Sequence, residues 1–174
     1  MGRSFFISLF ILSFAYITNA QTKNIVYKKH TDSQNGVSIN YPENWIKKEI
    51  KESAFFFMRP REEAGQKFME NVNLIIDPPD DLSLKEYAIS AKIKMEDQMV
   101  DFKEVKSEYI TMNGREYFKL IYTFTFNKLK MHDAYYITMD KGQAYNLICS
   151  ATESTFGRFY PVFETMAKSF KIIK

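Results

Sequence analysis

Cysteine is almost absent from this 174-residue sequence, and its absence limits the covalent chemistry of the chain. The one cysteine, Cys149, has no partner for a disulfide bond within the chain, so stability must come from a packed core. Cys149 follows apolar residues in a stretch typical of a buried strand, where burial disfavours the thiolate. We therefore interpret Cys149 as a packing residue. The sequence also lacks the ligand spacing of a zinc site.

A strong charge of one sign is missing as well. The 24 basic residues nearly balance the 21 acidic residues, and the formal net charge is only +3. Such a chain has no strong field to attract nucleic acid or an acidic membrane surface, so we expect no nucleic-acid partner. Five basic residues do gather in the first half of the chain, and we interpret them as a solvated face: Lys47, Lys48, Lys51, Arg59 and Arg61.

Side chains suited to acid–base catalysis are scarce. His30 and His132 are the only histidines, and neither lies in a recognisable catalytic motif. The sequence also lacks a phosphate-binding glycine loop and a nucleophile elbow. We therefore expect no enzyme activity and no cofactor. The alternative is a hydrolase or metal-dependent enzyme with an unfamiliar site, in which His30 or His132 lies in a cleft within hydrogen-bond reach of a carboxylate. Carboxylates that are distant in the sequence remain open as a catalytic pair.

Three nearby aspartates, Asp77, Asp80 and Asp81, raise the question of a metal site. Two prolines interrupt them, and they lack the regular spacing of a calcium-binding EF-hand loop. Acidic side chains are stabilising near a helix amino terminus, and prolines favour turns. We therefore interpret this segment as a turn that leads into a helix, and we expect no bound metal.

A long hydrophobic run occurs only at the amino terminus. Arg3 precedes an almost unbroken apolar run over residues 5–17, and Thr18 and Ala20 occupy the positions of a signal-peptidase site. The run is shorter than the about 20 residues that span a bilayer. The pattern predicts a signal peptide over residues 1–20 and one domain over residues 21–174. We expect an exported monomer, periplasmic or extracellular, that does not span the membrane.

Period-two alternation is the main pattern of the mature chain, and it predicts strands. A first hairpin joins residues 25–30 to residues 37–41 through a turn that ends at Asn35-Gly36, and further strands cover residues 54–58 and 72–76. A four-stranded meander follows over residues 104–112, 115–126, 131–139 and 143–152, with Asn113-Gly114 and residues 140–142 as turns. Both faces of the strand over residues 115–126 carry bulky side chains, so we expect a central strand that a helix covers on one side and that is partly covered on the other.

Two segments have helical patterns. Ser83 and Glu86 form a predicted capping box, after which an apolar stripe follows at helical spacing: Leu84, Tyr87, Ala88, Ala91, Met95 and Met99. Ile89 and Ile93 lie one turn apart on the otherwise charged side. Either a neighbouring segment covers them or they belong to a contact surface, and coverage is the favoured interpretation. The last helix is expected to begin near Pro161, after an aromatic lead-in of Phe156, Phe159 and Tyr160.

The only tryptophan, Trp45, lies in the stretch YPENW directly after the strand over residues 37–41. Pro42 restricts Tyr41 to extended geometry, which indicates the end of a strand and a turn over the sheet edge. Tryptophan suits a half-buried strand exit, because its ring is large and its N–H needs a partner. We interpret Trp45 as a corner of the core. The alternative is the rim of a pocket on which a partner stacks.

The order and spacing of several segments over nearly all of the mature chain resemble the PsbP-like family: residues 36–45, 70–74, 83–87, Asn113-Gly114, and residues 159–164 with 169–171. This family includes the photosystem II subunit PsbP, a Ran-binding eukaryotic relative and small exported bacterial proteins. The bacterial branch is the more similar. The resemblance implies an α+β fold, with an antiparallel sheet of about six to seven strands sandwiched by helices, and a role in binding or assembly. Fold alone does not transfer a ligand.

These observations lead to a functional hypothesis. We expect an exported, non-catalytic binding or assembly module of the bacterial cell envelope that contacts a protein or a small ligand. The predicted contact residues are Trp45, Ile89 and Ile93, which require an exposed apolar patch.

Overall fold

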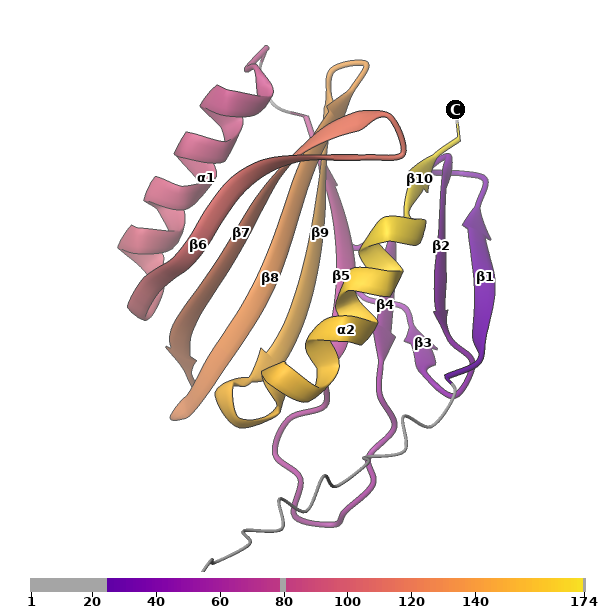
Figure 1. Cartoon of the computed structure of the whole chain (residues 1–174), viewed down its shortest axis with the longest axis vertical. Coiled ribbons are helices and arrows are strands. Elements are labelled where there is room, and N and C mark those ends of the chain that lie inside the picture. Colours follow the sequence, from indigo (N-terminus) through magenta and orange to yellow (C-terminus); the bar gives the residue numbers. More distant parts are fainter. Residues whose placement is uncertain (1–24, 79–80, 174) are drawn as a thin grey trace, which may run out of the picture.

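The computed structural model describes residues 25–78 and 81–173. The predicted signal peptide, its cleavage site and Asp80 lie outside these residues. Within them, a seven-stranded antiparallel sheet has the strand order β3-β4-β5-β9-β8-β7-β6, and a smaller sheet has the order β1-β2-β10 (Figure 1). None of the described helices is long and apolar enough to traverse a bilayer.

The meander predicted from the sequence is confirmed. Its strands are β6 (Val100–Met112), β7 (Arg115–Phe126), β8 (Leu129–Asp140) and β9 (Gln143–Thr152). Asn113 and Gly114 both have positive φ, 53° and 73°, as a tight hairpin turn of this hand requires. β9 also pairs with β5 (Asn71–Asp77), which pairs in turn with β4 (Phe55–Met58) and then with β3 (Ile46–Lys48). The short strand β3 was not predicted.

The first hairpin lies beside the large sheet rather than within it. β1 (Tyr27–Asp32) pairs with β2 (Val37–Pro42), and the two-residue strand β10 (Lys171–Ile172) pairs with the other edge of β2. Only Gly36 of the predicted turn pair has positive φ, at 64°. The side chains of Val37, Ile39 and Tyr41 are buried, as their shared face predicts.

The two helices lie on opposite faces of the seven-stranded sheet. α2 (Glu153–Ser169) packs with β2, β8 and β9 around one core cluster, while α1 (Leu84–Gln98) packs on β6, β7 and β8 around another (Figure 1). Strand β7 contributes to both clusters, through Tyr117 and Ile121 on the α2 side and through Leu120 and Tyr122 on the α1 side. The α+β class and the helix-covered antiparallel sheet are therefore confirmed.

The start of α2 was predicted wrongly. The helix begins at Glu153 and contains Pro161, instead of beginning near Pro161. An internal proline costs about 3 kcal/mol, because it removes one backbone hydrogen bond and its ring meets the preceding turn. The earlier turns bury Phe156 and Phe159 in the core, and each such burial contributes about 1.5–3 kcal/mol. This tertiary packing outweighs the local signal.

The capping box of α1 is confirmed, since Ser83 Oγ accepts from the Glu86 N–H at 3.3 Å and the Glu86 carboxylate accepts from the Ser83 N–H at 2.9 Å. The apolar stripe packs on the sheet as predicted, although only Ala88 is fully buried. The favoured coverage of Ile89 and Ile93 is wrong. Their side chains are 50% and 60% exposed, because α1 is the outermost layer on this side of the sheet.

Candidate functional site

Helix α1 covers only one half of its sheet face. It packs mainly on β6, β7 and β8, and it reaches β9 and β5 chiefly through Tyr87, which hydrogen-bonds to Asn146 and Asp77. Alternation along these strands sends Val72, Leu74, Leu147 and Cys149 into the α2-side core. The residues between them face the α1 side and are mostly half-buried: Asn71, Asn73, Ile75, Asn146, Ile148 and Ser150. The half-covered face is where a ligand can approach the sheet.

A groove with two lobes runs between α1 and this face. The first lobe has a volume of about 520 Å³, and Tyr122, Tyr135 and Ile148 form its floor. The second lobe, of about 670 Å³, is lined by Phe124, Met131 and Ser150, with others. Gln98 and Met99, at the end of α1, line both lobes, so the lobes adjoin each other. Each volume lies in the range of small-molecule sites, which is roughly 300–1,000 Å³.

Asp133 is buried beneath the groove and lines neither lobe itself. On β8 it alternates with Met131, which lines the second lobe, and with Tyr135, which lines the first. Its strand neighbours are Tyr122 on β7 and Ser150 on β9. The strand register thus places one buried carboxyl under an aromatic and aliphatic floor.

The Asp133 carboxyl is buried and only partly satisfied. Its Oδ2 accepts from Ser150 Oγ at 2.9 Å and from the Tyr122 hydroxyl at 3.3 Å, whereas its Oδ1 has no hydrogen-bond partner among the described residues. Burial raises the pKa of Asp133 to about 7, although hydrogen bonds from Ser150, from Tyr122 and from the Ala151 backbone act in the opposite direction. A buried acid with a strongly shifted pKa beside a cavity is typical of a functional site.

A second polar cluster, at the Asp77 end of the first lobe, is well satisfied. The Tyr87 hydroxyl donates to Asp77 Oδ2 at 3.0 Å, Asn146 Nδ2 donates to the Tyr87 oxygen at 2.9 Å, and the Tyr135 hydroxyl donates to Asn146 Oδ1. Burial, opposed by the Asn146 hydrogen bond and reinforced by Asp77, raises the pKa of Tyr87 to about 12. This cluster fastens α1 to the sheet and orients the tyrosine rings of the first lobe.

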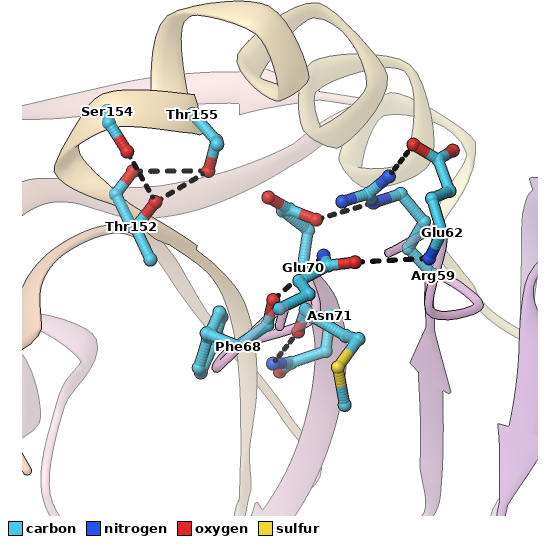
Figure 2. A network of polar contacts seen from close by, with 10 residues as sticks. Arg59, Glu62, Phe68, Glu70, Asn71, Thr152, Ser154 and Thr155 are labelled. Atoms are coloured by element: carbon cyan, nitrogen blue, oxygen red, sulfur yellow. Dashed lines mark hydrogen bonds and ion pairs between the residues drawn. The ribbon is translucent and has the colours of Figure 1, made fainter. Parts of the chain in front are cut away.

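The wall of the second lobe depends on the loop over residues 59–70, which supplies Phe68. Arg59 is buried and pairs with two carboxylates, Glu70 at 2.6 Å and Glu62 at 2.5 Å (Figure 2). Its guanidinium also lies 4.9 Å from the Phe159 ring centre on α2. The interpretation of Arg59 as part of a solvated face is therefore wrong, because its charge is neutralised inside the fold. This ion pair holds the loop against the sheet.

The predicted contact residues do not lie together. Trp45 is 5% exposed and meets Phe163 of α2 edge to face, with ring centres 6.4 Å apart. This burial agrees with the interpretation of Trp45 as a corner of the core, on the α2 side of the sheet. Ile89 and Ile93 lie on α1, on the other side, and present exposed side chains.

Neither histidine makes the hydrogen bond to a carboxylate that the enzyme alternative requires, although His30 lines a surface pocket together with Asp32. His132 stacks on Phe156 with ring centres 3.6 Å apart, and His30 meets Phe55 and Phe57 edge to face. Burial lowers the pKa of both imidazoles. Within residues 25–78 and 81–173, no hydrogen bond joins either ring to a carboxylate.

The remaining candidate residues, Cys149 and Asp77, have roles in the packing and hydrogen bonding of the fold. Cys149 is fully buried, as predicted, and burial raises the pKa of its thiol further. Asp77 ends β5 and binds Tyr87 and Asn146, a role that the sequence did not indicate. The described part of the chain contains no group of three acidic, histidine or cysteine side chains that could hold a metal ion.

Sequence reasoning missed Asp133, although the sequence contains a signal for it. Met131, Asp133, Tyr135 and Ile137 alternate along β8, so an acid stands within an apolar stripe that faces one side of the sheet. The surrounding groove had no such signal, because it forms where α1 stops short of β9 and β5.

Solved structures with the same fold come from several bacteria. CyanoP, the cyanobacterial PsbP of Synechocystis sp. PCC 6803, is 19% identical with a TM-score of 0.63, and the match covers 87% of this chain and 95% of that one. LpqN, described as involved in cell envelope biogenesis of Mycobacterium tuberculosis, is 11% identical with a TM-score of 0.63, covering 87% and 92%. A Pseudomonas aeruginosa protein described as a putative regulator is 13% identical with a TM-score of 0.61, covering 82% and 94%.

No curated protein sequence matches the chain significantly. The family model named PsbP, in contrast, matches residues 26–172, which is nearly all of the predicted mature chain. The fold, its solved neighbours and this match agree with one another. The chain belongs to the PsbP family.

Proposed function

We propose that this protein is an exported, non-catalytic binding module of the bacterial cell envelope, and that it holds a small ligand in the groove beside α1. The observation that carries the proposal is the groove itself, whose two lobes have volumes of about 520 and 670 Å³. Aromatic and methionine side chains form much of its lining, and a few polar groups, among them Asp77 and Ser150, lie between them. Such a lining and such volumes are typical of small-molecule sites.

Two further observations support the cellular setting. Residues 1–20 have the pattern of a signal peptide, and the structurally similar LpqN is described as acting in cell envelope biogenesis. The aromatic surroundings of His30 and His132 favour binding over hydrolysis, because neither imidazole is oriented by a carboxylate.

A protein partner is the second candidate, and the exposure of Ile89 and Ile93 favours it. The two side chains lie one helical turn apart, and both are at least half exposed. Trp45, also predicted as a contact residue, offers a partner little ring surface, so this candidate rests on the two isoleucines. Ile93→Asp is expected to weaken partner capture from the native envelope, while Ile25→Asp, a change at an exposed isoleucine outside α1, leaves capture unchanged. Equal recovery with both variants contradicts a contact at α1.

A bound ligand in the groove is tested by native mass spectrometry of the protein isolated from its own cells. Ala91 lines the first lobe, so Ala91→Trp fills that lobe. Asp97→Trp is the matched control, because it adds a similar ring to an exposed position of α1 outside the groove. We expect an added small-molecule mass on the wild type and on the control that Ala91→Trp removes. An identical spectrum for all three proteins contradicts the proposal.

A further inference from the structure

A separate cavity lies on the α2 side of the molecule, where the carboxyl end of α2 meets β2 and β10 (Figure 1). Its volume is about 340 Å³, and three lysines line it, Lys29, Lys168 and Lys171, so we call it the lysine pocket. Strand register builds its floor, since Lys29 of β1 lies opposite Asn40 of β2, and Lys171 of β10 lies opposite Ser38 of β2. The alternate residues of β2 point into the core, so Ser38 and Asn40 face the pocket.

The lysine pocket carries an excess of positive charge. None of the described residues that line it is acidic, and Lys29 and Lys171 form no ion pair with any described residue. Lys168 Nζ lies 3.3 Å from Glu164 Oε2, but the other oxygen of this carboxylate pairs with Lys119 at 2.7 Å. One acid therefore serves two lysines. The three pocket lysines are exposed, so a dissolved ligand can reach them.

Neutral donors accompany these charges. Ser38 is only 1% exposed and lines the pocket, and its hydroxyl forms no hydrogen bond with another described residue. The side-chain amide of Asn40, beside it on the same face of β2, is exposed and also forms none. Leaving a hydroxyl in a largely buried position without a partner costs free energy, and an acceptor oxygen of a ligand would remove that cost.

The carboxyl end of α2 lies beside the pocket, and the negative end of a helix dipole disfavours an anion. The last carbonyls of this helix are occupied, however. Asn113 Nδ2, from the turn between β6 and β7, donates to the carbonyls of Lys168 at 3.0 Å and Phe170 at 2.9 Å. Ser169 Oγ donates to the carbonyl of Met166 at 2.7 Å. These bonds reduce the negative charge that the helix end presents, and they hold Asn113 and Ser169 in the pocket wall.

We infer that the lysine pocket binds a phosphate group, carried by a free ion, by a soluble ester or by a lipid headgroup. This site goes beyond the proposed function, since it is separate from the groove beside α1. A phosphate ester has a charge of about −2 at pH 8 and several acceptor oxygens, which matches a cluster of lysines with neutral donors. A carboxylate has a single charge and is matched best by the fork of an arginine. Arg115, in the adjoining cavity, already pairs with Asp140 at 3.0 Å.

The inference is tested by NMR titration of isotope-labelled mature protein at pH 8 and constant ionic strength, with inorganic phosphate, glycerol 3-phosphate and acetate as probes. Saturating backbone shifts are expected at Ser38, Asn40, Ser169 and Lys171. Each hydrogen bond to a charged group contributes a factor of about 10 to 100 in affinity, so two of them give a Kd on the order of 1 mM. Acetate should bind about tenfold more weakly. The absence of saturation by either phosphate up to about 10 mM, or an equal affinity for acetate, overturns the inference.

Two substitutions locate the site. Lys171→Gln removes one charge and Ser38→Ala removes the buried hydroxyl, and each should weaken phosphate binding about tenfold. Lys103→Gln is the matched control, because Lys103 is an exposed lysine of β6 outside the pocket, and its affinity should equal that of the wild type. An equal loss in Lys103→Gln and Lys171→Gln would mean a general attraction of charge and overturns the site. Unchanged affinity in Ser38→Ala overturns the role of Ser38.

Vesicles separate the sources of the phosphate group. Sedimentation compares vesicles of phosphatidylcholine and phosphatidic acid with vesicles of phosphatidylcholine alone. Cosedimentation that requires phosphatidic acid and is lost in Lys171→Gln supports the site with a lipid headgroup as its ligand. Binding of the soluble phosphates without cosedimentation supports the site with a soluble ligand. Cosedimentation that Lys171→Gln leaves unchanged counts against a headgroup in this pocket.

Discussion

Replacing Asp133 with asparagine should stabilise the protein at alkaline pH. The folded-state pKa of Asp133 is about 7, against an ordinary value of 3.8, because burial disfavours the charged form. Below pH 3.8 the carboxyl is protonated in both the folded and the unfolded chain. Between pH 3.8 and 7 the unfolded chain loses this proton first, so the free energy of unfolding falls as pH rises. Above pH 7 the loss is complete and constant.

The size of the loss follows from the difference of about three pKa units. Each unit corresponds to about 1.4 kcal/mol, so Asp133 lowers stability by about 4 kcal/mol at pH 8 relative to pH 3. Asparagine keeps the shape of the side chain and does not titrate. Its amide requires an acceptor that Asp133 Oδ1 does not have, which reduces the gain. We expect Asp133→Asn to be about 2–4 kcal/mol more stable than the wild type at pH 8, with no gain at pH 4.

Urea unfolding of the mature protein at pH 4 and pH 8, followed by circular dichroism, measures this difference. Tyr122 of β7 and Cys149 of β9 are the titratable groups whose charges interact with that of Asp133, and burial raises the pKa of both, so neither titrates between these pH values. A variant that is less stable than the wild type by the same amount at both pH values refutes the reasoning. That result would mean that Asp133 is a structural acceptor for Ser150 and Tyr122.

Three further predictions concern the core, the groove wall and export. Trp45→Ala should lower the free energy of unfolding by about 3–5 kcal/mol in urea, since the indole is buried against Phe163, and a loss below about 1 kcal/mol would favour a role at a pocket rim instead. Glu70→Gln should cost about 3 kcal/mol and speed amide exchange over residues 61–69, because Arg59 loses its buried partner; unchanged exchange there would contradict a loop held by this pair. Intact-mass analysis of the exported protein should show a chain that begins at Gln21, and a full-length mass would contradict the signal peptide.

The sheet and its turns were predictable because local signals and tertiary structure agree there. Alternation in β6 to β9 matches two faces that are each packed, and Asn113-Gly114 provides the positive φ that its hairpin needs. The prediction failed where long-range packing overrides a local signal. A proline such as Pro161 normally marks a helix start. Here the burial of Phe156 and Phe159 extends α2 by about two turns on the amino-terminal side of Pro161.

The candidate site was less accessible to sequence reasoning. Asp133 was detectable in principle, as an acid in an apolar stripe, but its hydrogen bonding depends on how Ser150 and Tyr122 approach it from neighbouring strands. Ile89 and Ile93 are exposed because no other described segment packs on their side of α1. Helical periodicity shows which residues share a face, but it does not show whether another segment covers that face. The groove itself is a property of the layer arrangement.

The central claim, a ligand site in the groove beside α1, is tested most directly by titrating isotope-labelled mature protein with 4-phenylbutanol and following the backbone amide signals by NMR. The largest shifts should occur at groove positions of three elements: Met95 and Met99 of α1, Met131 and Tyr135 of β8, and Ile148 and Ser150 of β9. Ala91→Trp, which fills the first lobe, should abolish the shifts at that lobe. Shifts confined to the outer face of α1 at Ile89 and Ile93, or shifts that Ala91→Trp leaves unchanged, would contradict the account.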